Sequence, residues 1–115
     1  MTTYDMTNFV ANVSDLLRPL GITRNMRAYR ILQDALERIC EQEDRLEAVQ
    51  KDVYEPLAEQ YHCYWTAIQS VIRRAAQTAW STNPAYVQQL AGYPLTGVPS
   101  AVQFIEMLYN ALVRM

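Results

Sequence analysis

Glycine, cysteine and histidine are scarce in this sequence. Its 115 residues include 3 Gly, 2 Cys and 1 His. Two cysteines are too few for a disulfide framework, and together with one histidine they cannot supply the four ligands of a zinc site. The low glycine content excludes a flexible linker and a collagen-like repeat. We therefore expect one folded domain over residues 1–115, with no metal site and no cofactor.

No segment resembles a membrane span or a secretory signal. The uncharged stretch 75–105 contains three prolines and two glycines among many polar side chains, which a bilayer core does not tolerate. The opening residues 1–5 are polar and lack the apolar centre of a secretory signal. Half of the residues are hydrophobic and 19% are charged. The sequence thus predicts a soluble, reduced, cytoplasmic protein that does not bind membranes.

Charge is nearly balanced overall but unevenly distributed. The formal net charge is −2, unlike that of a protein whose whole surface holds nucleic acid. Residues 18–30 contain four arginines and no acid, whereas residues 34–59 contain nine acids and three bases. Between 60 and 105 the only charged residues are Arg73 and Arg74. This distribution favours an anion-binding surface on one side of the protein, although charged faces are commonly only solvated.

The hydrophobic periodicity is helical throughout, and no strand-like alternation competes with it. Thr7 and Thr23 are typical helix N-caps, and Ser100 with Gln103 forms a capping box. Pro56 cannot continue the helix before it but suits the first turn of a new one. The expected fold class is all-α, a compact domain of six to seven helices. These helices cover residues 7–20, 23–40, 44–53, 56–61, 65–80, 84–90 and 100–112.

Residues 54–80 have the layout of a helix-turn-helix, in which a short helix and a tight turn precede a longer helix. Ala58 is small enough to let the second helix cross closely, and Cys63 fills the turn. His62 stands where such turns commonly have glycine. Short helix pairs also cross in cores that bind nothing, so the layout alone leaves both interpretations open.

The second helix of this pair has an outward arc without acids. With successive residues about 100° apart, Ile68 and Ile72 share the arc that faces the core. The opposite arc carries only hydrogen-bonding and cationic side chains: Thr66, Ser70, Arg73 and Gln77, flanked by Gln69 and Arg74. Such a row could read double-stranded DNA in the major groove, because arginine matches guanine edges and glutamine matches adenine edges. Arg24 and Arg27 are candidates for phosphate contacts.

The same segment matches a family pattern. The chain reads Y-E-P-L-A-E-Q-Y and, after the turn, T-A-I-Q-S-V-I-R-R-A-A-Q-T-A-W. It thereby resembles the DNA-binding effector domain of the master sporulation response regulator of endospore-forming bacteria, with Y-P-x-I-A-x-x-F and S-R-V-E-R-A-I-R-H-A-I-E-x-A-W. Further collinear matches, over about 100 residues, are G-I with A-Y-R-I-L, L-A-G-Y, and P-S with Q-F-I. The resemblance implies a six-helix DNA-binding transcription factor, usually controlled by a phosphorylatable receiver domain.

The chain departs from the family pattern where bases would be read. In place of S-R-V-E-R it has T-A-I-Q-S at 66–70, so two arginines and a glutamate are missing. Arg73 is kept, and Arg74 replaces a histidine. The loop 93–99 is shorter than in the family and has no lysine. About a dozen residues precede the match, too few for a receiver domain. The resemblance therefore implies the family's fold with an altered DNA preference.

An aromatic pair supports a different function. Tyr64 and Trp65 stand at the start of the second helix, an unusual place for aromatics in a groove-reading helix. Aromatic residues are enriched in protein–protein hot spots, and the low net charge suits a protein partner. The alternative hypothesis is an interaction module that pairs with itself or with a full-length regulator and has lost DNA binding. The ordinary structural explanation is that Trp65 packs against Tyr61 or the acidic segment before it.

Nothing in the sequence supports catalysis. His62 and Cys63 are adjacent, and neighbouring side chains rarely point at one atom. The carboxylates of residues 34–59 have partners four residues away on solvated helix faces, such as Asp34–Arg38 and Glu41–Arg45. We therefore expect no catalytic residue.

Overall fold

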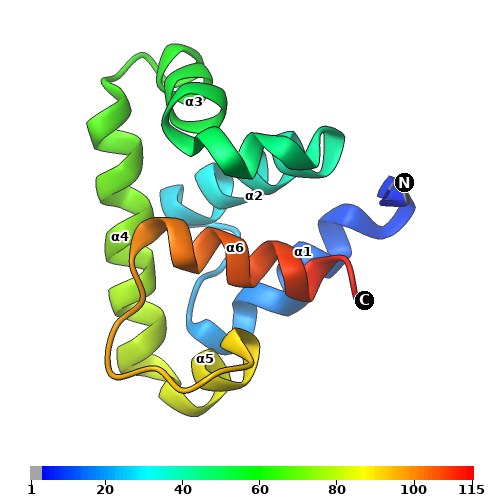
Figure 1. Ribbon diagram of the computed structural model, residues 1–115, viewed down its shortest axis with the longest axis vertical. Coiled ribbons are helices and arrows are strands. Elements are labelled where there is room, and N and C mark those ends of the chain that lie inside the picture. Colours follow the sequence, from blue (N-terminus) through cyan, green and yellow to red (C-terminus); the bar gives the residue numbers. More distant parts are fainter. Residues whose placement is uncertain (1–3) are drawn as a thin grey trace.

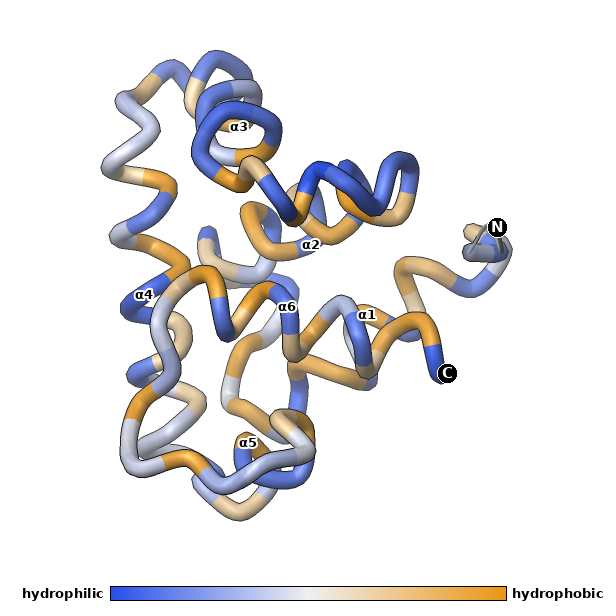
Figure 2. The backbone as a smooth tube through the Cα atoms, in the orientation of Figure 1, coloured by the Kyte–Doolittle hydropathy of each residue, from blue (hydrophilic) through white to orange (hydrophobic). Residues whose placement is uncertain are grey.

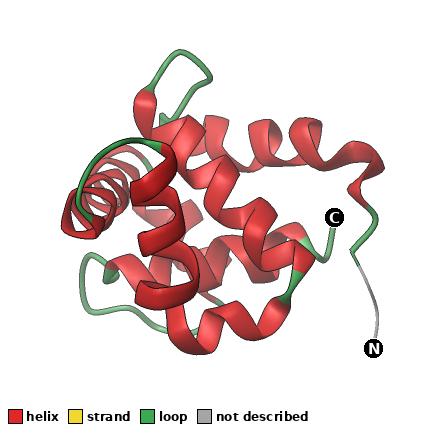
Figure 3. Ribbon diagram, turned by 90° about the horizontal axis from the view of Figure 1, so that it is seen from above, coloured by secondary structure: helices red, strands yellow, loops and turns green. Residues whose placement is uncertain are grey.

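The computed structural model describes residues 4–115, and within them every regular element is helical (Figure 3). Residues 1–3 of the polar opening segment lie outside the described part. The expected all-α class is confirmed. None of the helices in the described part has the length and apolar character of a bilayer span. The six α-helices are α1 (Phe9–Leu17), α2 (Arg27–Glu41), α3 (Glu55–Gln60), α4 (Trp65–Thr82), α5 (Pro84–Ala91) and α6 (Ala101–Leu112).

Helix α4 lies along one side of the molecule, with α3 at its start and α5 at its end (Figure 1). Helix α6 crosses between α4 and α1 and also packs against α2. Helices α1 and α6 are largely hydrophobic, whereas the segment leading into α3 is mostly hydrophilic (Figure 2). The hydrophobic core draws on all six helices, and its fully buried side chains include Leu17, Leu36, Leu57, Ile72 and Phe104.

Two helix starts differ from expectation because local polar contacts form separate turns. Thr7 is not the N-cap of α1: it lies in a short turn, Met6–Asn8, where the Asp5 carboxylate accepts hydrogen bonds from its N–H and its hydroxyl at 2.9 and 2.6 Å. Thr23 does not open α2, which begins four residues later. Its hydroxyl is 2.6 Å from Asn25 Oδ1, and its carbonyl accepts a bond from the Met26 N–H at 3.0 Å. Arg24 consequently lies in a loop.

Pro56 lies in the first turn of α3, as expected, but the expected break in the chain before it is absent. A 3-10 turn (Glu43–Ala48) leads through Val49 into a π-helical turn (Gln50–Tyr54), and α3 follows without leaving helical geometry. Proline has no N–H to offer the carbonyl four residues earlier, that of Asp52. Arg38 Nε of α2 donates to this carbonyl at 3.0 Å. A side chain from another helix thus replaces the lost donor, and the chain stays helical.

The last two helices begin and end as their caps predict. Asn83 accepts a hydrogen bond from the Tyr86 N–H at the start of α5, and Gly92 ends that helix with a positive φ of 74°. The expected capping box of α6 is present, because Ser100 and Gln103 bond each other's backbone N–H. The loop between them is held by Gln88, whose amide donates to the Tyr93 carbonyl and accepts from the Leu95 N–H.

Candidate nucleic-acid interface

Helix α3, a four-residue turn and α4 form the expected helix-turn-helix. In the turn His62 has a φ of 55°, the left-handed conformation that favours glycine. The turn is closed by two backbone bonds: the His62 N–H donates to the Glu59 carbonyl at 3.3 Å, and the Cys63 N–H donates to the Ala58 carbonyl at 2.9 Å. Ala58 is buried and Cys63 half-buried against the core. The expected packing of Cys63 at the turn is confirmed.

The aromatic pair at the start of α4 separates into one packed and one free ring. Trp65 is half-buried and stacks on Tyr54, with centroids 6.4 Å apart and the planes 7° from parallel. Its stacking partner is therefore the last residue of the acidic segment before α3, one of the two expected packing partners. Tyr64 is 84% exposed, the largest value among the exposed large hydrophobic residues. Of this pair, only Tyr64 has a largely exposed ring.

The inner face of α4 is buried as its periodicity predicts. Ile68 and Ile72 are fully inaccessible, and the small residues Ala75, Ala76 and Ala79 let the helix approach its neighbours closely. Val71, at the edge of this face, is only half-buried. Packing on α2, α3 and α6 holds the helix in one orientation, so its outer face is fixed as well.

The opposite face carries what we call the outer row: Thr66, Gln69, Ser70, Arg73, Arg74 and Gln77. Four of the six are exposed, and Gln69 and Ser70 are half-buried. Within residues 4–115 none of these side chains takes part in a hydrogen bond or an ion pair. The row continues toward the end of α4, where Thr78 and Ser81 line a shallow hollow with Arg74 and Gln77. The helical spacing that located the row predicts this extension too.

The arginines before and at the start of α2 gather at another place. Arg27 lies over the ring of Tyr61, 5.9 Å from its centroid, and Arg24 lines a hollow together with Tyr61. Arg18 is different, because it pairs with Asp15 at 3.5 Å and donates to the Ser14 hydroxyl at 3.0 Å. Arg24 and Arg27 therefore both lie near Tyr61, the first residue of the turn, and not along the outer row.

A comparison with protein families identifies the domain. The family described as "Sporulation initiation factor Spo0A C terminal" matches residues 13–112. The chain belongs to this family. The match includes the whole helix-turn-helix and all of α2 to α6.

The Spo0A C-terminal family is one of DNA-binding domains of a sporulation regulator, not of enzymes. In this member the longer, second helix of the motif is α4. The outer row lies on the solvent-facing side of this helix.

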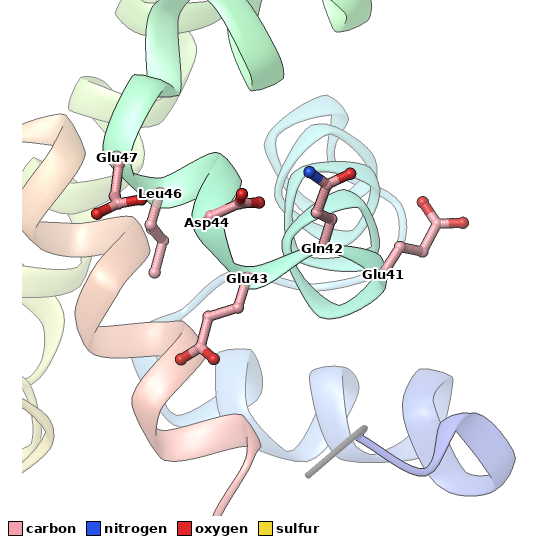
Figure 4. A pocket seen from close by; sticks show the side chains of 6 residues that line it. All are labelled: Glu41, Gln42, Glu43, Asp44, Leu46 and Glu47. Carbon is pink, nitrogen blue, oxygen red and sulfur yellow. The ribbon is translucent and has the colours of Figure 1, made fainter. Parts of the chain in front are cut away.

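The acids of this family member lie on a separate surface. Glu41, Glu43, Asp44 and Glu47 border a hollow of about 510 Å³ between the end of α2 and the following turn (Figure 4). Arg45 pairs with Glu41 at 3.4 Å, as expected. These four acids thus line a hollow that includes no residue of the outer row.

The expected Asp34–Arg38 pair is not formed. Asp34 accepts hydrogen bonds from the Tyr61 hydroxyl at 2.5 Å and from the Gln60 amide at 3.2 Å, while Arg38 is held by the Asp52 carbonyl. Burial, with help from the hydrogen bond to Asp34, raises the pKa of Tyr61 to about 12. A contact between α2 and α3 has therefore displaced a contact within α2. Sequence spacing gives no sign of it.

The His, Cys, Asp and Glu side chains that could bind a metal or take part in catalysis are either dispersed or unreactive. Among residues 4–115 there is no group of three His, Cys, Asp or Glu side chains placed to hold a metal ion. Burial and the nearby Glu37 and Glu41 raise the pKa of Cys40 to about 11, so its thiol stays protonated and unreactive at neutral pH. His62 is exposed in the turn.

Proposed function

We propose that this chain binds double-stranded DNA as a transcriptional regulator, with α4 in the major groove and a base preference that differs from that of the family pattern. The observation that carries the proposal is the outer row itself. Its six side chains include no acid, and within the described residues none is engaged elsewhere. Polar groups presented in this way can exchange water for base edges and phosphates without breaking contacts in the protein.

The first half of the outer row would supply the base contacts. Thr66, Gln69, Ser70 and Arg73 occupy the first nine residues of α4, and the early part of a recognition helix is the part that reaches base edges. Arg73 suits guanine and Gln69 suits adenine. The T-A-I-Q-S sequence replaces two arginines and a glutamate of the family pattern, and this replacement supports a changed preference.

The remaining groups would position the protein on the backbone. Arg74 and Gln77 lie farther along α4, and Arg24 and Arg27 lie beside the turn. The N-terminus of α4 adds partial positive charge, because it has no side-chain cap and no acid in its first turn. Such contacts strengthen binding to all sequences and make it depend on salt. A DNA-binding function of this kind requires a cytoplasmic location.

Fluorescence anisotropy with labelled duplexes at low salt tests the proposal. We expect binding at micromolar concentrations. Replacing Arg73 by Ala should weaken it about tenfold or more, since one specific base contact contributes about 1–3 kcal/mol. Arg114→Ala removes the same charge from the end of the chain, where Arg114 is exposed, and serves as the control. Absence of binding at tens of micromolar by a folded protein, or equal losses in both variants, would contradict the proposal.

A second candidate function is a protein-interaction module that pairs with a second copy or with a full-length regulator. It is favoured by the 84% exposure of Tyr64 at the start of α4. Trp65 does not support it, because that ring is stacked on Tyr54. The test is light scattering of the purified chain, alone and with a full-length regulator of the family. A strict monomer that forms no complex in either case excludes this function, and loss of a complex in Tyr64→Ala supports it.

A further inference from the structure

A hollow of about 360 Å³ lies where Val10 of α1, the loop before α2, one face of α2 and the turn after α3 meet. It does not include any residue of the outer row. The loop contributes Arg24, α3 is followed by Tyr61, and α2 contributes four neighbours on one face. Those four α2 residues are Tyr29, Arg30, Gln33 and Asp34. Their i, i+4 spacing brings two pairs of polar side chains to one side of the helix.

Two guanidinium groups in the lining have no acidic partner. Within residues 4–115 neither Arg24 nor Arg30 is in an ion pair. The one acid of the lining, Asp34, instead accepts hydrogen bonds from Tyr61 and Gln60. The lining therefore carries more positive than negative charge, and its cations are unengaged. Guanidinium groups in this state bind oxyanions through charge-assisted hydrogen bonds.

The buried phenol of Tyr29 gives an independent indication of a ligand. Tyr29 is only 4% exposed, and its hydroxyl has no hydrogen-bond partner among the described residues. Buried polar groups in native proteins are almost always paired, and an orphan calls for an ion, a water or a ligand. Tyr29 borders the same hollow as the two unpaired arginines. A hydroxyl donor and two cations are the groups that a phosphate oxyanion needs.

We propose that this hollow binds a small phosphate-bearing molecule, with its oxyanion between Arg24 and Arg30 and a hydrogen bond from the Tyr29 hydroxyl. The Gln33 amide offers a further donor. A phosphate monoester carries up to two negative charges, which match two guanidinium groups, whereas each phosphate of DNA carries one. Asp34 stands beside the oxyanion and weakens its binding. The site needs no nucleic acid and so goes beyond the proposed function.

NMR titration of the whole chain with inorganic phosphate, at constant ionic strength and without DNA, tests this site. We expect saturable amide shifts centred on residues 29–34. Arg30→Ala should weaken binding about tenfold, and Tyr29→Phe about fivefold, because each removes a donor to a charged group. Asp34→Asn should tighten binding several-fold by removing the repulsion. Arg74→Ala removes an exposed arginine outside the hollow and should change nothing.

Three results would overturn the proposal. Shifts that do not saturate, or that are equal at Arg73 and Arg74, would show an adventitious ion only. Equal binding of dimethyl phosphate, a diester, would make the hollow a contact for DNA phosphates instead. Unchanged affinity in Tyr29→Phe would remove the hydroxyl from the site, and this variant keeps the shape of the core. Because the phosphate titration contains no DNA, a negative result there does not bear on DNA binding by α4. A negative result in the DNA-binding test likewise does not bear on the phosphate site.

Discussion

Two neighbouring regions of this domain use their polar side chains in opposite ways. In residues 34–61, which we call the acidic region, polar groups bind one another: Arg38 holds the Asp52 carbonyl, and Tyr61 donates to Asp34. Along α4 the six side chains of the outer row bind nothing within the described part of the chain. The net charge of −2 is therefore the sum over two regions whose polar side chains differ in what they contact. Several polar groups of the acidic region bond to other parts of the fold, whereas those of the outer row make no such bond within residues 4–115.

The largest difference should appear between the two faces of α4 itself. Ile72→Ala removes a fully buried side chain from the core and should lower the free energy of unfolding by about 2–4 kcal/mol. Thr66→Ala, on the outer row, should change it by less than about 0.5 kcal/mol. Urea unfolding followed by circular dichroism measures both. Similar losses in the two variants would show that the outer row is part of the packing.

Tyr54 links the acidic region to α4 through its stack on Trp65. Its ring is 1% exposed, and its hydroxyl has no partner among residues 4–115. Tyr54→Phe keeps the stack and removes this orphan group, so it should raise the free energy of unfolding at neutral pH by about 1 kcal/mol. A loss of stability, measured by urea unfolding, would mean that the hydroxyl has a bonding role.

The same residue predicts a dependence on alkaline pH. Burial raises the pKa of Tyr54 to about 12, above its ordinary value of 10.0. The unfolded chain therefore loses this proton first, and stability should be full below pH 10 and fall as the pH rises toward 12. Between pH 10 and 12, urea unfolding should show a smaller decrease in the free energy of unfolding for Tyr54→Phe than for the wild-type protein. If the free energy of unfolding falls equally with pH in both proteins, the pKa of Tyr54 is not raised in the folded state.

A smaller effect is expected at the turn that joins the two regions. His62 adopts a φ of 55°, which costs a residue with a side chain about 1 kcal/mol. His62→Gly should therefore raise the melting temperature, while His62→Ala, which keeps a Cβ, should not. Differential scanning calorimetry of the three proteins gives the comparison. If the melting temperature of His62→Gly does not exceed that of His62→Ala, the backbone of the turn is not strained.

The smallest effect belongs to the exposed ion pair of the acidic region. Arg45 and Glu41 are 3.4 Å apart, with Glu41 well exposed. Glu41→Gln should lower the free energy of unfolding by no more than about 0.5 kcal/mol, and salt should reduce that loss further. The measurement is urea unfolding at low and high ionic strength. A loss that exceeds this limit and resists salt would show that the pair is a structural element of the fold.

The sequence predicts what depends on periodicity and on contacts close in the chain. The all-α class, α4 with its two faces, and the Ser100–Gln103 capping box all follow from spacing within one helix. The start of α2 could not be placed, because Thr23, Asn25 and Met26 form a competing local turn.

Contacts between distant segments account for the other differences. The helix continues past Pro56 because Arg38, on another helix, supplies the missing donor. The helical spacing of the sequence located the outer row of the candidate site, because all its members lie on one helix. It could not show that Arg27 lies over the ring of Tyr61, because those residues meet only after folding.

We propose that the outer row of α4, and not the acidic segment 43–55, contacts DNA. Mapping amide shift changes by NMR as duplex DNA is added tests this most directly. We predict that the largest changes fall on Thr66 to Gln77 and at the turn beside Arg27, while residues 43–55 stay unchanged. Changes centred on residues 43–55, or a folded protein with no changes at all, would contradict the account.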